Sequence, residues 1–317
     1  MDMMDYVDPE DLANLQETQP RFAGNWDHLY KLFWASRLKA DGRASWNDYA
    51  DAHRGRIDLR DADFNGWRLA GFDLGGGDLS DAACSNADFS GANLAGCTLD
   101  RTDFDLAKLP GVDLRAAQGQ QADFSRADLR EAILNEATFI GSRWNKTMLA
   151  GADCRRLRLA GSQIEACLFD GADFAQARFE DCRWQRCRVV GLPFVEAVFR
   201  DNLIEFCAFD GADCSGAQLH GVVFKRTSLG GIDLRHADCT GSNFFEADLR
   251  GAQLDGAHCQ RVNFRHANCT GVTFGTARLG EADFFIAHLD AADLSQAIDL
   301  AADQFLHAKG NSDTRLP

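Results

Sequence analysis

Large apolar side chains recur at every fifth residue over most of this chain. From Leu59 to Leu294 the spacing defines 48 positions, which hold 20 Leu, 16 Phe, 6 Cys, 2 Ile, 2 Trp and 1 Val, with Gly119 as the one exception. The residue two places earlier is small, most often Ala, and the other three are polar or Gly. A period of five matches neither the 3.6-residue turn of a helix nor the two-residue alternation of a strand.

The period instead predicts a chain that turns a corner every five residues, with one large and one small side chain pointing inward from each side. Four sides close a coil of 20 residues, so the 48 repeats make about 12 coils of a solenoid in which each coil packs on its neighbours. The coil around Gly119 lacks its large inward side chain and should be the weakest. Gly119→Leu is therefore expected to raise the melting temperature.

The repeat unit also resembles that of a known family. Units such as Ala87-Asp88-Phe89-Ser90-Gly91 and Ala247-Asp248-Leu249-Arg250-Gly251 follow the pattern A-[DN]-[LF]-x-x. This pattern strongly resembles the pentapeptide-repeat family from Ile57 to Gln296. The resemblance implies an all-β solenoid, a right-handed quadrilateral β-helix of short parallel strands with short helical caps at its N- and C-terminal ends.

The segments on either side of the array differ from it. Residues 1–55 are predicted to be a helical N-terminal cap or a partner-binding segment, in which Asn25 caps a helix from Trp26 to Lys39 that ends before Gly42. Because the end of a β-solenoid exposes unpaired strand edges, we expect this helix to cover the first coil. Residues 56–296 form the array. Residues 297–317 resemble a recurrent C-terminal tail of bacterial family members and are predicted to contain a short helix near residues 301–308.

The residues that often carry chemistry fit the array better than they fit an active site. All eleven Cys fall on inward positions, where a free thiol behaves as a small buried hydrophobe. His residues lie on different faces, and no catalytic or phosphate-binding motif is present. Asp recurs one residue before the large position, as at Asp88 and Asp173, so regularly that it indicates a structural device. The sequence thus predicts a protein that is not an enzyme and takes no cofactor or metal.

Composition and charge argue against nucleic-acid-binding, membrane-spanning and secreted proteins. The net charge of −15 argues against direct nucleic-acid binding, which needs clustered cations. The sequence contains no run of 18 apolar residues, so no membrane span is expected. The first ten residues carry four acids and no base, unlike a secretory signal peptide. Together with the resemblance, these features predict a bacterial cytoplasmic protein.

Function is then expected on the outer surface, whose predicted faces differ in charge. One face has ten acids and four bases, and its acids are Asp73, Asp113, Glu136, Asp153, Asp173, Glu196, Asp213, Asp233, Asp255 and Asp293. The opposite face is neutral but carries a basic stripe: Arg126, Arg143, Lys146, Arg183, Arg186, Lys225 and Arg226. The same face has an outward apolar set of Phe206, Phe245, Phe285 and Ile286, and exposed apolar clusters usually mark contacts.

Two functions remain open. The first is a non-enzymatic scaffold or adaptor that binds another protein through the apolar set, which would also allow a homodimer through the C-terminal coils. The tail, with Phe305 and Leu306, is an equally good occupant of that patch. The second follows from the resemblance, since some family members are quinolone-resistance factors that imitate DNA. It is a DNA-mimicking modulator of a type II topoisomerase, DNA gyrase or topoisomerase IV, acting through the acidic face.

Overall fold

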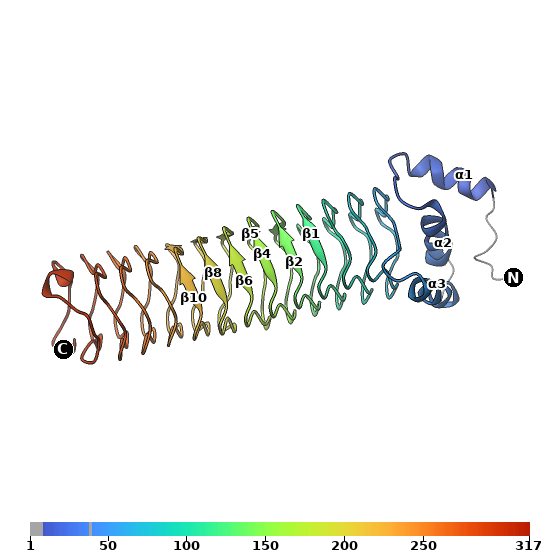
Figure 1. Ribbon diagram of the computed structural model, residues 1–317. Helices are drawn as coiled ribbons and strands as arrows, with labels where there is room; N and C mark the ends of the chain where they lie inside the picture. The colour runs from blue at the N-terminus through green and yellow to red at the C-terminus, as the bar shows by residue number, and fades with distance from the viewer. Residues whose placement is uncertain (1–8, 38–39) are drawn as a thin grey trace. The chain divides into compact units, whose positions relative to one another are not determined.

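The chain forms a β-solenoid of parallel strands, and the described residues before it contain three helices. The computed structural model describes residues 9–37 and 40–317. Contacts divide the chain into two compact units, Met1–Asp153 and Cys154–Pro317. Figure 1 labels the helices of the first unit and most strands of both units.

The corners of the solenoid are residues in the left-handed backbone region, and they recur at every fifth position. Gly66, Gly71 and Gly76 have φ of 71–72°, and the non-glycine corners Asp61 and Asn86 have φ of 59°. A hydrogen bond such as Trp67 N to Phe64 O (2.9 Å) closes many of these corners. Because this region disfavours most side chains with a Cβ, it explains why Gly recurs at the corner position of the sequence.

The first unit stacks its coils in a register of 20 residues. Isolated parallel bridges join residues 20 apart from Asp58↔Asp78 onward. Where the pairing extends over three consecutive residues it forms strands, and β1 pairs with β2 in parallel. The strands of this unit are β1 (Gln118–Gln120), β2 (Thr138–Ile140) and β3 (Arg143–Asn145).

The second unit has two parallel ladders in the same 20-residue register. One ladder runs β4-β6-β8-β10 and the other β5-β7-β9-β11. Their bounds are β4 Arg158–Ala160, β5 Gln163–Glu165, β6 Arg178–Glu180, β7 Arg183–Gln185, β8 Val198–Arg200, β9 Leu203–Glu205, β10 Gln218–His220 and β11 Val223–Lys225. In Figure 1, β4, β6, β8 and β10 follow one another along one side of this unit. A 3-10 helix, η2 (Ala302–Phe305), lies in the tail.

Stacked aromatic rings fill much of the interior. In the second unit the rings of Phe224, Phe244, Phe264 and Phe284 stack with successive centroid distances of 4.9, 5.5 and 4.9 Å. The predicted inward positions are buried almost without exception. A one-residue shift in register would move every large side chain to the outside, so this stack fixes the register.

Gly119 overturns one sequence-based expectation. It lies in β1 opposite Phe139 of the next coil. A Cβ at Gly119 would come within 2.9 Å of the Leu99 carbonyl oxygen and 3.0 Å of Cδ1 of Phe139. The ring of Phe139 therefore occupies the space that a large inward side chain at residue 119 would need, and the expectation that Gly119→Leu stabilises the fold is wrong.

Three helices precede the coils: α1 (Pro9–Thr18), α2 (Trp26–Arg37) and α3 (Ala40–Ala52). Asn25 caps α2 as expected, because Asp27 N donates to Asn25 Oδ1 at 2.9 Å. The last two residues of the predicted helix, 38 and 39, lie outside the described residues. α2 ends at Arg37, before Gly42 as expected, and Gly42 itself lies within the next helix, α3. Burial of Trp46 and Ala50 on the same helix outweighs the roughly 1 kcal/mol helix penalty of a glycine.

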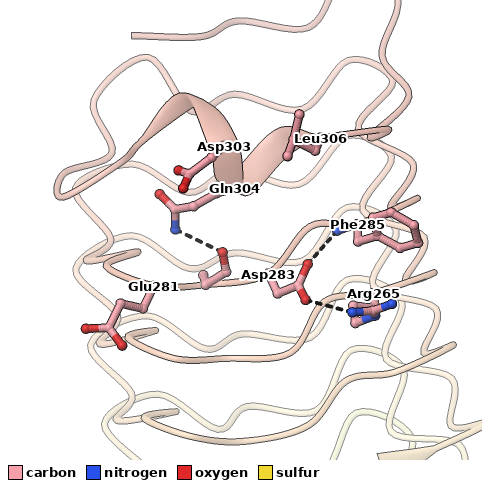
Figure 2. Close-up of a pocket in the computed structure, with 8 residues that line it drawn as sticks. Arg265, Glu281, Asp283, Phe285, Asp303, Gln304 and Leu306 are labelled. Atoms are coloured by element: carbon pink, nitrogen blue, oxygen red, sulfur yellow. Dashed lines mark hydrogen bonds and ion pairs between the residues drawn. The ribbon is translucent and has the colours of Figure 1, made fainter.

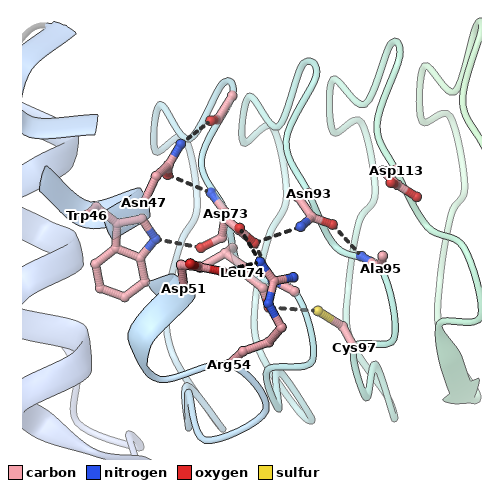
Figure 3. A network of polar contacts seen from close by, with 12 residues as sticks. Trp46, Asn47, Asp51, Arg54, Asp73, Leu74, Asn93, Ala95, Cys97 and Asp113 are labelled. Carbon is pink, nitrogen blue, oxygen red and sulfur yellow. Dashed lines mark hydrogen bonds and ion pairs between the residues drawn. The ribbon is translucent and has the colours of Figure 1, made fainter. Parts of the chain in front are cut away.

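Side chains of this helical segment satisfy the backbone edge of the first coil. Gln19 accepts from Asp63 N (2.5 Å) and donates to Asp63 O (2.6 Å). Asn47 accepts from Asp73 N (2.8 Å), and Trp46 Nε1 donates to Asp73 O (2.6 Å), as Figure 3 shows. His28 Nδ1 accepts from Asp58 N at 3.0 Å. These side chains replace the hydrogen bonds that a preceding coil would supply, which leaves less open edge for aggregation.

Gly119→Leu should lower the stability of the fold by about 1–3 kcal/mol, because it overpacks the space held by Phe139. Thermal unfolding followed by circular dichroism measures the effect, with Gly119→Ala as the smaller step. In the double variant Gly119→Leu/Phe139→Ala, part of the loss should be recovered relative to the sum of the single changes. A higher melting temperature for Gly119→Leu would contradict this account.

Acidification should weaken the contact between the helical segment and the first coil through His28. Its ring is buried, it accepts from Asp58 N, and it faces Asp27, Asp58, Tyr49 and His53. Burial lowers its pKa below the ordinary value of 6.5. As the pH falls, His28 is protonated in the unfolded chain before it is protonated in the folded chain. The contribution of this contact to the free energy of unfolding is therefore complete above pH 6.5 and declines below it, by at most about 1.4 kcal/mol per pH unit.

His28→Gln is the matched control, because glutamine can accept the same hydrogen bond and does not titrate. Melting temperatures from pH 7.5 to 5 should fall more steeply for the native chain than for this variant. Equal slopes would show that His28 does not contribute.

Candidate functional site

The cysteines lie in the core, as predicted. All eleven are free and buried, and burial raises the pKa of the Cys97 thiol to about 12. Cys187 and Cys207 stack in successive coils, with Cys187 N donating to Cys207 Sγ at 3.4 Å. Within residues 9–37 and 40–317, no three His, Cys, Asp or Glu side chains converge in a way that would hold a metal ion.

Polar residues at the small inward position have a role that the sequence reasoning missed. Thr102, Thr147 and Thr227 each donate to the carbonyl oxygen 23 residues earlier, at 2.8–3.1 Å. The thiols of Cys97 and Cys187 do the same at 3.0 and 3.4 Å. The clue was the restriction of this position to small residues, several of which carry a hydroxyl or a thiol. A donor there satisfies a buried carbonyl group of the preceding coil.

Trp144 and Trp184 each lie two residues after a small inward position, and they differ in one hydrogen bond. Trp144 Nε1 donates to Ser142 Oγ at 2.7 Å. Trp184 has Cys182 at the equivalent place, and its Nε1 has no hydrogen-bond partner within the part of the chain that the structure describes. Sulfur is a weak acceptor, so the substitution of Ser by Cys accounts for the difference.

The recurrent acids act at the corners, as their regularity predicted. Oδ1 of Asp113 accepts from the backbone N of Arg115, and Oδ1 of Asp173 and Asp213 accepts from the N two residues later, at 2.9–3.0 Å. Asp and Asn are suited to such local turns. A carboxylate at this position is therefore partly used by the fold itself.

The predicted acidic face is divided between the two units and is partly neutralised in each. Asp113 in the first unit pairs with Arg115, and Asp233 in the second pairs with Arg235, each at 2.5 Å. Their side chains are only 18% and 15% exposed, and the hydrogen bond from Arg235 lowers the pKa of Asp233. The other acids of the face lie in the first unit (Asp73, Glu136, Asp153) and in the second (Asp173, Glu196, Asp213, Asp255, Asp293).

The basic stripe is likewise compensated by carboxylates. In the first unit Arg126 pairs with Asp105, and Arg143 with Asp123. In the second unit Arg186 pairs with Glu165, Lys225 with Glu205 and Arg226 with Glu246, at 3.1, 3.1 and 3.7 Å. Lys146 and Arg183 complete the stripe, one in each unit. Most of these cations thus already have a carboxylate partner.

The apolar set lies entirely in the second unit and follows one corner. Phe206 is 50% exposed and has a positive φ of 55°, with the Arg226 guanidinium 5.8 Å from its ring centroid. Phe245 and Phe285 are half-buried, and the ring of His266 contacts both, at 5.5 and 6.4 Å. Ile286 is also half-buried and has a φ of 57°. The structure therefore brings Phe245, Phe285 and Ile286 onto one edge and leaves Phe206 as the most exposed member.

The tail contacts this edge without covering it. Phe305 continues the interior stack on Phe284 at 5.3 Å, and His307 meets the ring of Phe285 at 5.3 Å. Leu306 remains 60% exposed. Figure 2 shows the open hollow of about 340 Å³ that results, lined by Arg265, Glu281, Ala282, Asp283, Phe285, Asp303, Gln304 and Leu306.

A second hollow of about 230 Å³ lies on the same face of this unit, beside Phe245. Its lining residues are Val223, Phe224, Lys225, Arg226, Asn243, Phe245 and Glu246. The backbone bridges Val223↔Asn243↔Asn263↔Asp283 place the two hollows in one column, two coils apart. Each hollow has one phenylalanine of the apolar set as a wall.

Family models match most of the repeat array. The description "Pentapeptide repeats (8 copies)" matches residues 57–94, 78–115, 111–143, 122–162 and 242–280, and "Pentapeptide repeat region" matches residues 157–234. This chain belongs to the pentapeptide repeat family. The family assignment made from the A-[DN]-[LF]-x-x pattern is thereby confirmed.

Solved structures that are similar to this pentapeptide repeat protein have different roles. HetL of the cyanobacterium Nostoc sp. strain PCC 7120, involved in heterocyst differentiation regulation, is 25% identical over 73% of this chain and 90% of its own, with a TM-score of 0.34. QnrB1, a plasmid-mediated fluoroquinolone resistance protein, is 16% identical over 55% of this chain and 92% of its own, with a TM-score of 0.27. No curated protein matches this sequence.

None of the helices within the described ranges combines the length and the apolar character needed to cross a bilayer.

Cys182→Ser should stabilise this pentapeptide repeat protein by about 1 kcal/mol, because a hydroxyl at residue 182 can accept from Trp184 Nε1 and still donate to Leu159 O. Thermal and urea unfolding measure the change. Cys187→Ser is the matched control, since Val189 stands where the tryptophan would be. Equal effects of the two substitutions would contradict the assignment.

Proposed function

We propose that this chain is a non-enzymatic scaffold that binds another protein through the apolar corner of its second unit. In this proposal residues 57–296 form a right-handed quadrilateral β-helix of about 12 coils. Residues 1–55 cap its first coil, and residues 297–317 close its last. A bacterial cytoplasmic location and a homodimer through the C-terminal coils remain predictions.

The observation that carries the proposal is the strained and exposed position of Phe206. The left-handed corner position is held mostly by Gly, Asp, Asn or long polar residues, whereas Leu106 in the first unit and Phe206 and Ile286 in the second adopt it with bulky apolar side chains. Such a conformation costs roughly 1–3 kcal/mol and persists where the structure needs it or where function uses it. The ring of Phe206 is half exposed, so it adds little burial in return. A contact with a partner explains both features.

The groups that suggested chemistry support a binding role over catalysis. The thiols pack inside the coils, and the recurrent aspartates hydrogen-bond to the backbone at the corners. The hollows beside Phe245 and Phe285 lie on the outer face and are lined by paired charges and aromatic rings. Surfaces of this kind contribute contact area for a partner.

DNA mimicry through the acidic face is the alternative and has weaker support. A duplex displays about one charge per 1.7 Å, whereas Asp113 and Asp233 are mostly buried and paired with arginines. Oδ1 of Asp173 and of Asp213 also accepts a backbone hydrogen bond at a corner. Reversal of these residues to lysine would thus disturb the corners as well as the charge, and Asp→Asn is the cleaner change.

Site-specific photo-crosslinking in cells of the source organism tests the proposal. The photoreactive residue p-benzoylphenylalanine replaces Phe206 in one variant and Gln176, at a corner beside the acidic row of the second unit, in another. We expect a discrete protein adduct from position 206 and none from position 176. Adducts from position 176 alone, with a type II topoisomerase as the captured protein, would support the alternative and contradict the scaffold proposal.

Phe206→Asn supplies the matched loss of function, because asparagine tolerates the left-handed region better than phenylalanine. The variant should be at least as stable as the native chain, and it should lose the partner captured from position 206 when that partner is assayed with purified proteins. Ala166→Asn, at the same corner with φ of 52°, shows the stability gain by itself and should retain the partner. A drop in stability for Phe206→Asn would mean that the ring serves the fold.

A further inference from the structure

The corner of the second unit that carries Phe245 and Phe285 presents two aromatic walls in the same backbone setting. Phe245 N donates to Asn243 Oδ1, and Phe285 N donates to Asp283 Oδ1, both at 2.9 Å. Arg265, one coil between them, makes the same turn with Asn263 at 3.0 Å. The outward row is therefore Lys225, Phe245, Arg265, Phe285, alternating cation and ring. The turn hydrogen bonds hold the backbone of Phe245, Arg265 and Phe285 before any partner arrives, which reduces the entropic cost of binding.

The distance between the two walls is set by the coil spacing. The interior rings of Phe244, Phe264 and Phe284 stack at 5.5 and 4.9 Å, so two coils span about 10 Å, close to two strand separations of ~4.8 Å. A polyproline II segment rises about 3.1 Å per residue with three residues per turn, which returns a side chain to the same face every ~9.3 Å. A β-strand returns every ~6.7 Å and does not match this distance.

An α-helix and a polyproline II segment both match this distance, and the residues between Phe245 and Phe285 distinguish the two. In an α-helix, positions i and i+7 lie about 10.5 Å apart, but positions i+3 and i+4 face the same surface. There they would meet Arg265 and His266, which already contact Phe285 at 4.6 and 6.4 Å. In a polyproline II segment the two intervening residues point away from this surface, so the extended conformation fits the row.

The two hollows differ in charge, and this difference sets the direction in which a polyproline II segment of a partner would bind. The hollow at Phe285 has the acids Glu281, Asp283 and Asp303 against one base, Arg265, which pairs with Asp283 at 3.3 Å. Exposed Leu306 lies at the same hollow, as Figure 2 shows. A lysine or arginine fits there, with its aliphatic stem against Phe285 and Leu306 and its charge near Glu281 and Asp303. The hollow at Phe245 has the apolar wall without excess acid.

We propose that this corner binds an extended, proline-rich segment of a partner protein, with an aliphatic side chain against Phe245 and a lysine or arginine three residues later at Phe285. The inference rests on the proposed scaffold function and deepens it by naming the chemistry of the partner. Recognition of this kind uses a preformed extended ligand on an aromatic surface. The basic residue adds specificity through the acidic hollow.

Fluorescence anisotropy with the full chain tests the inference. The probe is a fluorescein-labelled peptide, Pro-Pro-Leu-Pro-Pro-Lys-Pro-Pro, and the comparison peptide has the same composition with leucine and lysine two residues apart. We expect saturable binding of the first and at least about tenfold weaker binding of the second, a change of about 1.4 kcal/mol. Equal binding of both peptides, or no binding of the first, would overturn the proposal.

Variants of the chain test each wall separately. Phe245→Ala and Phe285→Ala should each weaken binding about tenfold, whereas Phe245→Tyr should retain it and so excludes a folding defect. Glu281→Gln with Asp303→Asn should weaken the lysine peptide and leave a peptide with norleucine in place of lysine unaffected. Leu168→Ala, at a 49% exposed apolar residue outside both hollows, is the matched control and should bind normally. Native affinity in both phenylalanine-to-alanine variants would contradict the inference.

The two levels of proposal fail independently. An adduct from position 206 in cells together with no binding of the proline-rich peptide would refute the inference and leave the scaffold function standing. Peptide binding with the expected spacing, without any adduct from position 206, would refute the role of Phe206 and place recognition at Phe245 and Phe285.

Discussion

The left-handed corner at every fifth residue is the constraint on which the rest of this structure depends. A chain that must turn after each five residues can form only short strands, and it can send only two side chains inward between turns. The large inward residue and the small one two places before it follow from this spacing. Since most corners also donate their N–H to the next coil, as Gly66 N does to Ser85 O, the same turn sets the 20-residue register.

The register then decides what every other residue type can do. Stacking places identical positions of successive coils about 5 Å apart, so aromatic rings and thiols form columns. Inside the coils, hydroxyls and thiols at the small position donate to buried carbonyl groups. Among the described residues, the buried donor Trp184 Nε1 is left without a partner, because Cys182 is a poor acceptor. Outside, the same stacking brings opposite charges of neighbouring coils together, as in Lys225 with Glu205.

This arrangement limits how the outer surface can take on a function. Repeated aspartates and arginines are largely engaged in corners and ion pairs, so the surface that differs most from the repeat is the apolar corner of the second unit. Phe206, Phe245 and Phe285 interrupt a pattern in which polar residues serve the fold equally well. Binding residues on a solenoid are expected at such departures, because the repeat itself supplies stability and leaves a few positions free to vary.

The sequence by itself determined the period, the inward positions, the burial of all eleven cysteines, the corner role of the aspartates and the cap at Asn25, because each depends on spacing along the chain. Tertiary structure decided the features that join residues far apart in sequence. Phe139 fills the space at Gly119, Gln19 and Asn47 complete the edge of the first coil, and α3 runs through Gly42 because Trp46 is buried. The apolar corner was visible in the sequence, whereas its hollows and the neutralised basic stripe were not. Both depend on which side chain of the next coil comes within a few ångströms, and a repeat pattern does not contain that distance.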